Sequence, residues 1–332
     1  MAAEKIINDW KKNIFKPVYW LEGEEEYYID KLMDYARDHI LDEKDSAFNL
    51  TTFYGKDANW VDVINACRRY PMFAERQVVL LKEAQQMRDV DKLESYVENP
   101  LHSTVFVVSY KDKKVDGRTR LAKLLKEKGV LLTTKRMYEN QLPEWTIEMI
   151  ESKGLSISQK GLMLLVDHTG NDLTRIENEI EKISLNLGQR RNITEDDIEK
   201  FIGVSKDFNV YELQAALADK DLAKSIRIIQ YFESNPKAGP IQLILPSLYG
   251  FFSKVFMIYG ANSREEKVVA TALGVNPFFV KDYLKAANHF TYPQVEAILL
   301  LLHKYNLRSV GINDVGTEDA SLLKEMVVKM IN

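Results

Sequence analysis

The chain has 332 residues, a formal net charge of −4 and 45% hydrophobic residues, which is typical of a globular protein with two or three domains. This charge balance argues against wrapping nucleic acid over the whole surface, although a local basic patch can still contact a phosphate backbone. No segment approaches the roughly 18 to 20 apolar residues of a membrane span, and the N-terminus lacks the basic-then-apolar order of a signal peptide. We therefore expect a cytoplasmic protein without a membrane partner.

Residue types that support metal binding or nucleophilic catalysis are sparse. Cys67 is the only cysteine, which excludes an intrachain disulfide and a zinc site built on several cysteines, and the five histidines are scattered. The sequence contains no G-x-S-x-G turn, and no Ser/His/Asp or Cys/His set can be nominated. We expect no metal site, no cofactor and no catalytic residues.

Residues 1–138 predict a doubly wound α/β domain that opens with a short amphipathic helix. Strands are expected at 18–22, 49–54, 77–82, 104–110 and 130–133, with helices between them at about 26–40, 60–69, 90–97 and 118–128. The apolar runs 78–81 and 105–108 do not alternate with polar residues, which is typical of parallel strands covered on both faces. These elements predict one parallel five-stranded sheet.

The turn after the first strand has the layout of a nucleotide-binding loop without its phosphate-binding groups. A working loop needs G-x-x-x-x-G-K-[ST], in which backbone amides, a lysine and a hydroxyl hold the phosphates and magnesium. Here Gly23 is followed by Glu24, Glu25 and Glu26, whose carboxylates suit the start of a helix and repel a phosphate. The turn indicates a degenerate nucleotide site, and the alternative is an ordinary strand-to-helix turn.

An apolar cluster lies between the helix at 60–69 and the strand at 77–82, with charged residues on both sides. It consists of Tyr70, Pro71, Met72 and Phe73. Because proline ends the helix and restricts its neighbours, Met72 and Phe73 are expected to project from a helix-strand corner. Adjacent large apolar groups on a rigid corner are typical of an anchor that fills a partner's pocket. The alternative is that one or both side chains pack into the core.

The strand at 77–82 ends in a second element that is unfit for nucleotide binding. Its apolar run is followed by Lys82 and Glu83 at the place where a magnesium-binding Asp-Glu pair would stand. An ammonium there repels Mg²⁺. Together with the turn at Gly23, this favours an NTPase-like scaffold without NTPase chemistry, while the alternative is that Lys82 is a solvated residue at a strand end.

A basic stretch follows the fourth strand. It contains Lys111, Lys113, Lys114, Arg118 and Arg120, and Asp112 and Asp116 dilute its charge. The pattern favours a solvated loop, and contact with a DNA backbone is the second interpretation.

Residues 139–205 predict a small lid-like domain of four short helices. Leu142 and Pro143 open the first helix, 156–159 the second, and 172–187 forms the third. Residues 194–197 cap the fourth helix. No strand-like run interrupts these helices.

Residues 206–332 predict an all-helical domain, with segments near 210–219, 221–232, 241–259, 264–273, 277–288, 293–308 and 317–331. Residues 268–280 imitate a helix-turn-helix motif. The positions that would read base edges hold Pro277, Phe278 and Phe279, and apolar groups there favour packing over readout.

Several motifs, in this order, resemble one known family across nearly the whole chain. The first strand and turn fit Tyr-x-Leu-x-Gly-x-Glu, the apolar pair Met72-Phe73 precedes the third strand, and Leu142-Pro143 with Trp145 opens a helix. The later motifs are Gly170-Asn171-Asp172-Leu173, Glu181-Lys182-Ile183-Ser184-Leu185, Ile193-Thr194 with Asp197-Ile198-Glu199, and Phe208-Asn209-Val210-Tyr211-Glu212-Leu213. The chain resembles the delta subunits of the bacterial DNA polymerase III clamp loader.

This resemblance implies an AAA+ fold with an α/β domain, a small helical lid and a helical collar that joins a hetero-pentameric ring. It implies a non-catalytic subunit of a DNA-directed DNA polymerase (nucleotidyltransferase) complex that opens the sliding clamp, beta, alongside the gamma/tau ATPase subunits, delta prime and primed DNA. The family's clamp-binding wedge corresponds to Met72 and Phe73, with Tyr70 and Pro71 beside it. Where the family often has leucine first, this chain has methionine, whose flexible thioether suits an adaptable pocket.

Two other functions are compatible with the residues alone. One is a DNA-binding regulator that uses residues 268–280 and a degenerate nucleotide sensor. The other is an ATPase whose phosphate loop has drifted from the usual pattern. Nucleotide and DNA binding by the isolated chain separate these readings from a clamp-opening subunit.

Overall fold

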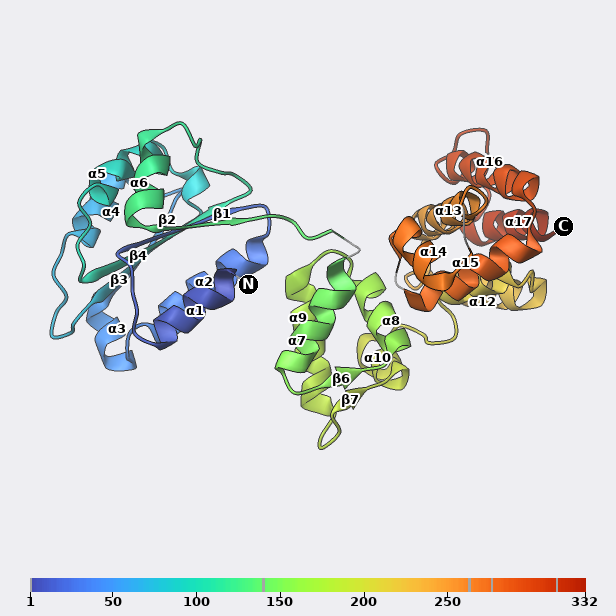
Figure 1. Ribbon diagram of the computed structural model, residues 1–332, viewed down its shortest axis with the longest axis horizontal. Helices are drawn as coiled ribbons and strands as arrows, with labels where there is room; N and C mark the ends of the chain where they lie inside the picture. The colour runs from blue at the N-terminus through green and yellow to red at the C-terminus, as the bar shows by residue number, and fades with distance from the viewer. Residues whose placement is uncertain (1, 139–140, 262–263, 276, 315) are drawn as a thin grey trace. The chain divides into compact units, whose positions relative to one another are not determined.

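A computed structural model describes residues 2–138, 141–261, 264–275, 277–314 and 316–332, apart from the side chains of 277–279. The chain divides into two compact units, Met1–Met137 and Tyr138–Asn332 (Figure 1). The first is an α/β unit and the second is mostly helical, as the sequence predicts.

The N-terminal unit is built around one parallel five-stranded sheet in the order β2-β3-β4-β1-β5. The strands are β1 (Val18–Gly23), β2 (Leu50–Tyr54), β3 (Gln77–Lys82), β4 (Thr104–Lys111) and β5 (Val130–Thr134). The predicted sheet is confirmed, and each predicted strand end lies within one residue of the observed end.

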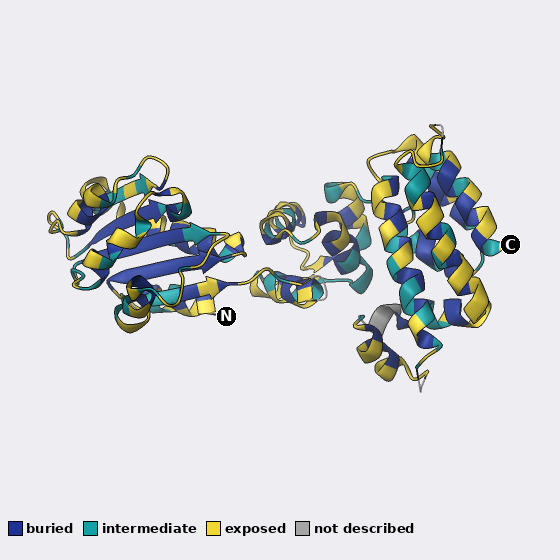
Figure 2. Ribbon diagram, turned by 90° about the horizontal axis from the view of Figure 1, so that it is seen from above, coloured by how far each residue is buried: buried dark blue, intermediate teal, exposed yellow. Residues whose placement is uncertain are grey.

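Helices cover both faces of this sheet (Figure 1). One face carries α1 (Ala2–Lys11) and α2 (Glu26–His39), and the other carries α4 (Trp60–Cys67), α5 (Glu94–Val97) and α6 (Arg120–Lys128). Alternate residues of each strand belong to the two cores: Tyr19 and Leu21 pack on the α2 side, and Trp20 packs on the α4 side. The three central strands, β1, β3 and β4, are therefore buried on both faces, which explains their continuous apolar runs (Figure 2).

Several short elements differ from the sequence prediction. Helix α3 (Glu43–Asn49) runs directly into β2, so Asn49, expected as a strand residue, is the last residue of a helix. The helix expected at 90–97 is a 3₁₀ turn, η2 (Val90–Leu93), followed by α5, and another turn, η1 (Ala84–Gln86), follows β3. Elements of three to seven residues are too short for a helical hydrophobic period to be read from the sequence.

The second unit begins with four helices, as predicted: α7 (Leu142–Ser152), α8 (Gln159–Thr169), α9 (Leu173–Asn186) and α10 (Glu195–Ile202). The expectation that no strand interrupts them is wrong. Two-residue strands, β6 (Ser156–Ile157) and β7 (Asn192–Ile193), pair in parallel before α8 and α10. A pair this short has no alternation to read, because only one residue of each strand faces the core.

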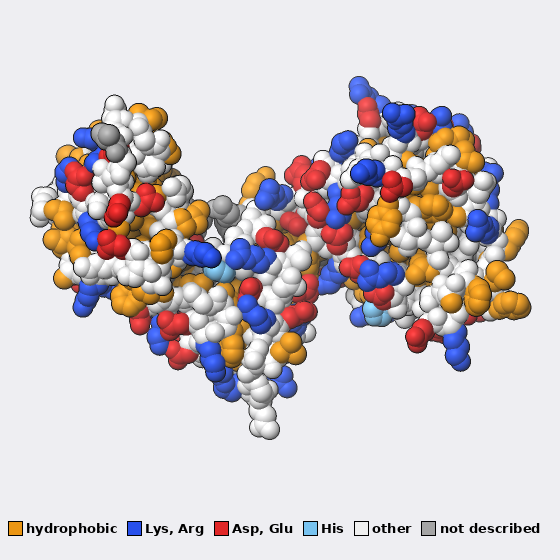
Figure 3. Space-filling model, turned by 180° about the vertical axis from the view of Figure 1, so that it is seen from behind, with side chains coloured by type: hydrophobic (Ala, Val, Ile, Leu, Met, Phe, Trp, Pro, Cys, Tyr) orange, Lys and Arg blue, Asp and Glu red, His pale blue; other side chains and the backbone are white. Residues whose placement is uncertain are grey.

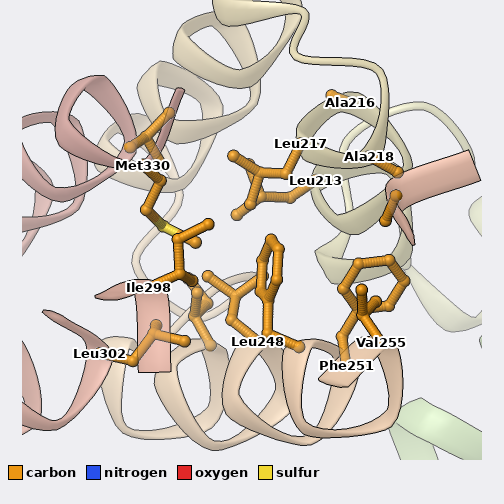
Figure 4. Close-up of a cluster of buried hydrophobic side chains, with 14 of the residues drawn as sticks. Leu213, Ala216, Leu217, Ala218, Leu248, Phe251, Val255, Ile298, Leu302 and Met330 are labelled. Atoms are coloured by element: carbon orange, nitrogen blue, oxygen red, sulfur yellow. The ribbon is translucent and has the colours of Figure 1, made fainter. Parts of the chain in front are cut away.

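Seven more helices follow in the described part of the chain. They are α11 (Val210–Ala218), α12 (Leu222–Ser234), α13 (Ile241–Ile258), α14 (Glu266–Leu273), α15 (Pro277–His289), α16 (Tyr292–Ser309) and α17 (Asp319–Ile331). Side chains of α11, α13, α16 and α17 point toward one another and form one apolar core (Figure 4).

Helix α13 differs from the expectation that no segment reaches membrane-span character. Over its 18 residues the mean hydropathy is 1.5, so by length and composition alone it is able to cross a membrane. Its apolar side chains, including Leu248, Phe252 and Val255, are buried in the core of this unit. A helix in the middle of a helical core is apolar for that reason, so this feature is weak support for a membrane span.

An ion-pair network joins the end of α16 to α17. Arg308 pairs with Asp314 at 2.7 Å and with Glu325 at 2.8 Å. Hydrogen bonds from the Thr317 amide and Arg308 lower the pKa of Asp314 to about 2. Hydrogen bonds from Lys329 and Arg308 lower the pKa of Glu325 to about 2. Both carboxyls therefore stay ionised over the ordinary pH range.

Candidate partner-binding corner and nucleotide-like turn

The two candidate sites of the N-terminal unit lie at opposite ends of the strands in the sheet. Because the strands are parallel, the Gly23 turn and Lys82 lie at their carboxyl ends. Residues 70–73 connect α4 to β3 and therefore lie at the amino ends. A strand of six residues rises about 20 Å, so the two sites are separated by roughly that distance.

The Gly23 turn occupies the place where open α/β sheets usually bind a ligand. Strand β1 has β4 on one side and β5 on the other, and the crevice at such a switch in strand order is the common ligand site. Here the first backbone amides after the glycine point inward. Glu24 N–H donates to the Thr134 carbonyl at 3.3 Å, and Glu25 N–H donates to Thr134 Oγ1 at 3.2 Å. Thr134 therefore occupies two amides that a phosphate would otherwise need.

Gly23 itself is required by this close approach. Its φ of 122° is a conformation that L residues rarely adopt, and a Cβ there would lie 2.1 Å from the Thr134 carbonyl oxygen. The buried Glu25 caps α2 by accepting a hydrogen bond from Tyr27 N–H at 3.4 Å. The turn is thus closed by contacts among β1, α2 and β5.

A lysine beside this turn is held by two carboxylates. Lys111 pairs with Gly23 in the sheet register, and its ammonium contacts Glu26 at 2.9 Å and Asp30 at 2.8 Å. Burial alone would lower the pKa of Lys111, but hydrogen bonds to Asp30 and Glu26 outweigh burial, and the pKa is raised. Lys111 is therefore charged and committed to α2.

The end of β3 is also closed by internal contacts. The Lys82 carbonyl accepts a hydrogen bond from Gly55 N–H at 2.7 Å, and Glu83 N–H donates to Ser109 Oγ at 2.9 Å. Glu83 has a left-handed backbone, with φ of 53°, and its carboxylate accepts from the Gln86 amide. In the described part of the chain, no group of three or more His, Cys, Asp or Glu side chains is placed to hold a metal ion.

At the amino ends of the strands, the apolar cluster projects into solvent. Phe73 is 98% exposed, Tyr70 78% and Met72 53%, and Pro71 is partly buried. The alternative that Met72 or Phe73 packs into the core is wrong. Large apolar groups that contribute nothing to a core are expected where another molecule covers them.

The backbone of this corner is fixed although its side chains are free. The buried Asn49 accepts a hydrogen bond from Met72 N–H at 2.7 Å and donates from Nδ2 to the Met72 carbonyl at 3.0 Å. The same Nδ2 donates to the Asp45 carbonyl at 3.1 Å, within α3. One side-chain amide therefore pairs with both main-chain groups of residue 72, as a neighbouring strand would.

A second buried amide fixes the two ends of the connection. Gln77 Nε2 donates to the Arg69 carbonyl at 2.6 Å, the Ala66 carbonyl at 3.0 Å and Thr104 Oγ1 at 2.9 Å. Thr104 in turn donates to the Cys67 carbonyl at 2.9 Å. The Cys67 thiol beneath this network is fully buried, and burial raises its pKa. The end of α4 and the start of β3 are thus held together under the exposed cluster.

Phe73 is held in a strained backbone conformation. Its φ of 58° lies in the left-handed region, which costs an L residue roughly 1–2 kcal/mol. Since its side chain is exposed, core packing does not repay this strain. Strain of this kind persists where the surroundings hold it, and it is concentrated at functional sites.

The basic stretch after β4 is largely paired with acids. Lys111 is bound as described, Arg118 contacts Asp116 at 2.7 Å, and Arg120 pairs with Glu98. Lys113 and Lys114 are exposed. Basic and acidic side chains are also interspersed over the face shown in Figure 3. A contact with a DNA backbone at this stretch remains a prediction.

The helix-turn-helix imitation is built into the helical core. Val269, Ala270 and Leu273 of α14 are buried there, and Gly274 ends the helix with φ of 60°. The backbone of α15 follows, but the side chains of Pro277, Phe278 and Phe279 lie outside the described residues. The buried side chains on one face of α14 are what the packing of two helices requires.

Residues 19–135, which include both candidate sites, match the family model described as DNA polymerase III, delta subunit. Over 329 residues the chain is 25% identical to "DNA polymerase III subunit delta" of Bacillus subtilis (strain 168), covering 95% of this chain and 93% of that protein. The chain is similar to the DNA polymerase III delta subunits. The resemblance seen in its motifs is confirmed.

Two further matches, one to a sequence and one to a solved structure, extend the comparison. The chain is 22% identical over 306 residues to "Probable DNA polymerase III subunit delta" of Aquifex aeolicus (strain VF5), covering 85% of each protein. The structure of the Bacillus subtilis DNA clamp loader delta protein aligns with a TM-score of 0.56 and 24% identity over 99% of both chains. This second comparison supports a shared fold with that delta protein.

The residue of the corner that sequence reasoning missed is Asn49. The sequence predicts it as the first residue of a strand, and nothing in its neighbourhood marks it as a partner of a residue 23 positions away. The strand that follows also holds Thr51 and Thr52, so one more polar residue does not stand out. The contact forms because the fold places α3 beside the turn that follows α4.

Proposed function

We propose that this chain is a clamp-loader delta subunit that binds the sliding clamp, beta, and opens it for loading onto primed DNA. Tyr70, Pro71, Met72 and Phe73 form the clamp-binding corner. The observation that supports this most strongly is the nearly complete exposure of Phe73 on a fixed backbone, at the position where the family's wedge falls.

The anchor residues supply a large part of the binding energy that opening requires. Burying the almost fully exposed Phe73 in an apolar pocket contributes about 1.5–3 kcal/mol, and Met72, which is already half-buried, about half as much, so the two give roughly 2–4.5 kcal/mol together. Moving a ring from 1% to 99% open takes about 5.5 kcal/mol of differential affinity for the open form. Only contacts that are better in the open clamp count toward that shift, so we place the pocket near a subunit interface of the clamp.

We also propose that the chain takes no part in ATP hydrolysis. Thr134 occupies the first amides of the Gly23 turn, Lys111 is paired with Glu26 and Asp30, and Lys82 ends β3 where a metal carboxylate would stand. These contacts support a degenerate nucleotide site at Gly23, Glu24, Glu25, Glu26, Lys82 and Glu83. ATP held by neighbouring subunits then controls whether the corner reaches the clamp.

The remaining parts of the chain follow the same proposal. Residues 1–138 form the degenerate AAA+ domain, 139–205 the lid and 206–332 the collar. The collar joins the gamma/tau ATPase subunits and delta prime in a hetero-pentamer in the cytoplasm. Among the basic residues after β4, the exposed Lys113 and Lys114 are the best placed to approach a DNA backbone.

A clamp pull-down tests the central claim. The native chain and Met72→Ala/Phe73→Ala are each mixed with the cognate sliding clamp, and the double variant is expected to lose most of its binding. Leu185→Ala is the matched control, because this α9 side chain is also highly exposed but lies in the other unit. Equal capture of clamp by the native chain and the double variant would contradict the proposal.

Two titrations of the isolated chain test the competing functions. Calorimetric titration with Mg-ATP is expected to give no saturable binding, and saturable, magnesium-dependent binding would support an ATPase. Fluorescence anisotropy with duplex DNA at moderate salt is expected to give weak or no binding. A clear sequence preference would support a DNA-binding regulator instead.

A further inference from the structure

We propose that Asn49 is a positioning residue for clamp binding, because its side chain holds the corner ready before the clamp arrives. The inference rests on the proposed function of Met72 and Phe73. It concerns a residue that is buried and therefore does not reach a partner itself.

The hydrogen bonds of Asn49 serve the exposed turn. Its Oδ1 accepts from Met72 N–H at 2.7 Å, and its Nδ2 donates to the Met72 carbonyl at 3.0 Å. The further bond from Nδ2 to the Asp45 carbonyl fixes which end of the amide faces each group. A buried amide that pairs with both main-chain groups of an exposed residue keeps that residue in one conformation.

This pairing also supports the conformation of Phe73. Residue 72 is fixed at both its N–H and its carbonyl, and the carbonyl belongs to the peptide that leads into Phe73. The left-handed φ of Phe73 is unfavourable for an aromatic residue and would relax in a mobile loop. Asn49 therefore determines the direction in which the Phe73 side chain leaves the surface.

The expected effect is large enough to measure. A corner that is already ordered does not lose backbone freedom on binding. The free-energy cost of ordering one residue corresponds to a roughly ten-fold decrease in affinity. Removing the Asn49 amide frees at least residue 72. We expect clamp affinity to fall about ten-fold although the exposed surface is unchanged.

Surface plasmon resonance with the cognate sliding clamp tests this in the full-length chain. Asn49→Ala removes the amide, and Asn49→Asp keeps its shape but places a carboxylate oxygen against the Met72 carbonyl. Both variants are expected to bind about ten-fold more weakly. Gln214→Ala is the matched control, because this buried amide bonds Ser247 in the other unit and its loss should leave clamp affinity unchanged.

Hydrogen exchange gives a readout that a general loss of stability does not imitate. In the native chain the Met72 amide should be protected although its side chain is exposed. In the Asn49 variants this amide should exchange faster, while amides of β1 and β4 keep their protection. If both variants fail to fold, protection of the Met72 amide in the native chain decides: a rate typical of an unstructured loop overturns the inference.

The outcomes separate this inference from the proposed function. If Met72→Ala/Phe73→Ala binds the clamp like the native chain, the assignment of the corner is wrong. If that variant loses binding while both folded Asn49 variants keep native affinity, the corner is the binding site but Asn49 does not position it. Weaker binding by both Asn49 variants with a freely exchanging Met72 amide supports the inference.

Discussion

Replacing Phe73 with glycine should make the chain more stable and at the same time remove the clamp binding that we propose for it. The left-handed φ of 58° costs an L residue roughly 1–2 kcal/mol, and glycine adopts it without that cost. Glycine also gives the unfolded chain more freedom, which costs about 0.5–1 kcal/mol. Because the phenyl ring is almost fully exposed, its removal loses almost no burial. The net gain in the free energy of unfolding is therefore about 0–1.5 kcal/mol, with a central value of about 0.75 kcal/mol.

Thermal unfolding with tryptophan fluorescence checks this value, because Trp10, Trp20 and Trp60 lie in the N-terminal unit. A gain of this size should raise the Tm of that unit by roughly 2–4 °C. Phe73→Ala is the control: alanine keeps the Cβ and therefore the strain, so its stability should stay within about 0.5 kcal/mol of native. Equal stability of the glycine and alanine variants would refute the strain at Phe73, and native clamp affinity in Phe73→Gly would refute its role as an anchor.

Three other perturbations follow from contacts in both units. Gly23→Ala should destabilise the N-terminal unit by several kcal/mol in urea unfolding, because its φ of 122° excludes a side chain and a Cβ would lie 2.1 Å from a β5 carbonyl oxygen. Arg308→Ala should lower stability at pH 7 and make stability less sensitive to acid. The two carboxyls it contacts have folded pKa values of about 2, so their contribution is present above the unfolded values near 4 and is lost as the pH falls towards 2; urea unfolding at several pH values measures this. Phe252→Ala should cost about 3–5 kcal/mol in chemical unfolding, whereas Leu243→Ala, exposed on the same helix, should cost less than about 0.5 kcal/mol.

The centre of the sheet was predictable because strands β1, β3 and β4 are buried on both faces. Continuous apolar runs such as 78–81 mark such strands whatever surrounds them, and the observed β3 has the predicted bounds. Helix α3 and the β6–β7 pair were not predictable, because each depends on tertiary contacts and neither is long enough to show a hydrophobic period. For the same reason, the sequence predicts Asn49 in a strand, whereas it is the last residue of α3.

The candidate corner was only partly predictable. Pro71 and the adjacent apolar pair indicated a projecting turn, but the sequence left open whether Met72 and Phe73 face the core or solvent. The backbone of this corner is held by Asn49, which is 23 residues from Met72 in the sequence, and by Gln77, and both bond to main-chain atoms. Main-chain groups are present at every residue, so no residue type in 70–73 reveals which side chain will bind them.

The burial of Cys67 makes this chain convenient for site-selective labelling. Its sulfur is shielded by the core directly beneath the corner, and it is the only thiol in the sequence. A maleimide dye added to the folded protein would therefore react with a cysteine introduced at an exposed position and leave Cys67 untouched. Slow modification of Cys67 itself would then report how often α4 lifts from the sheet.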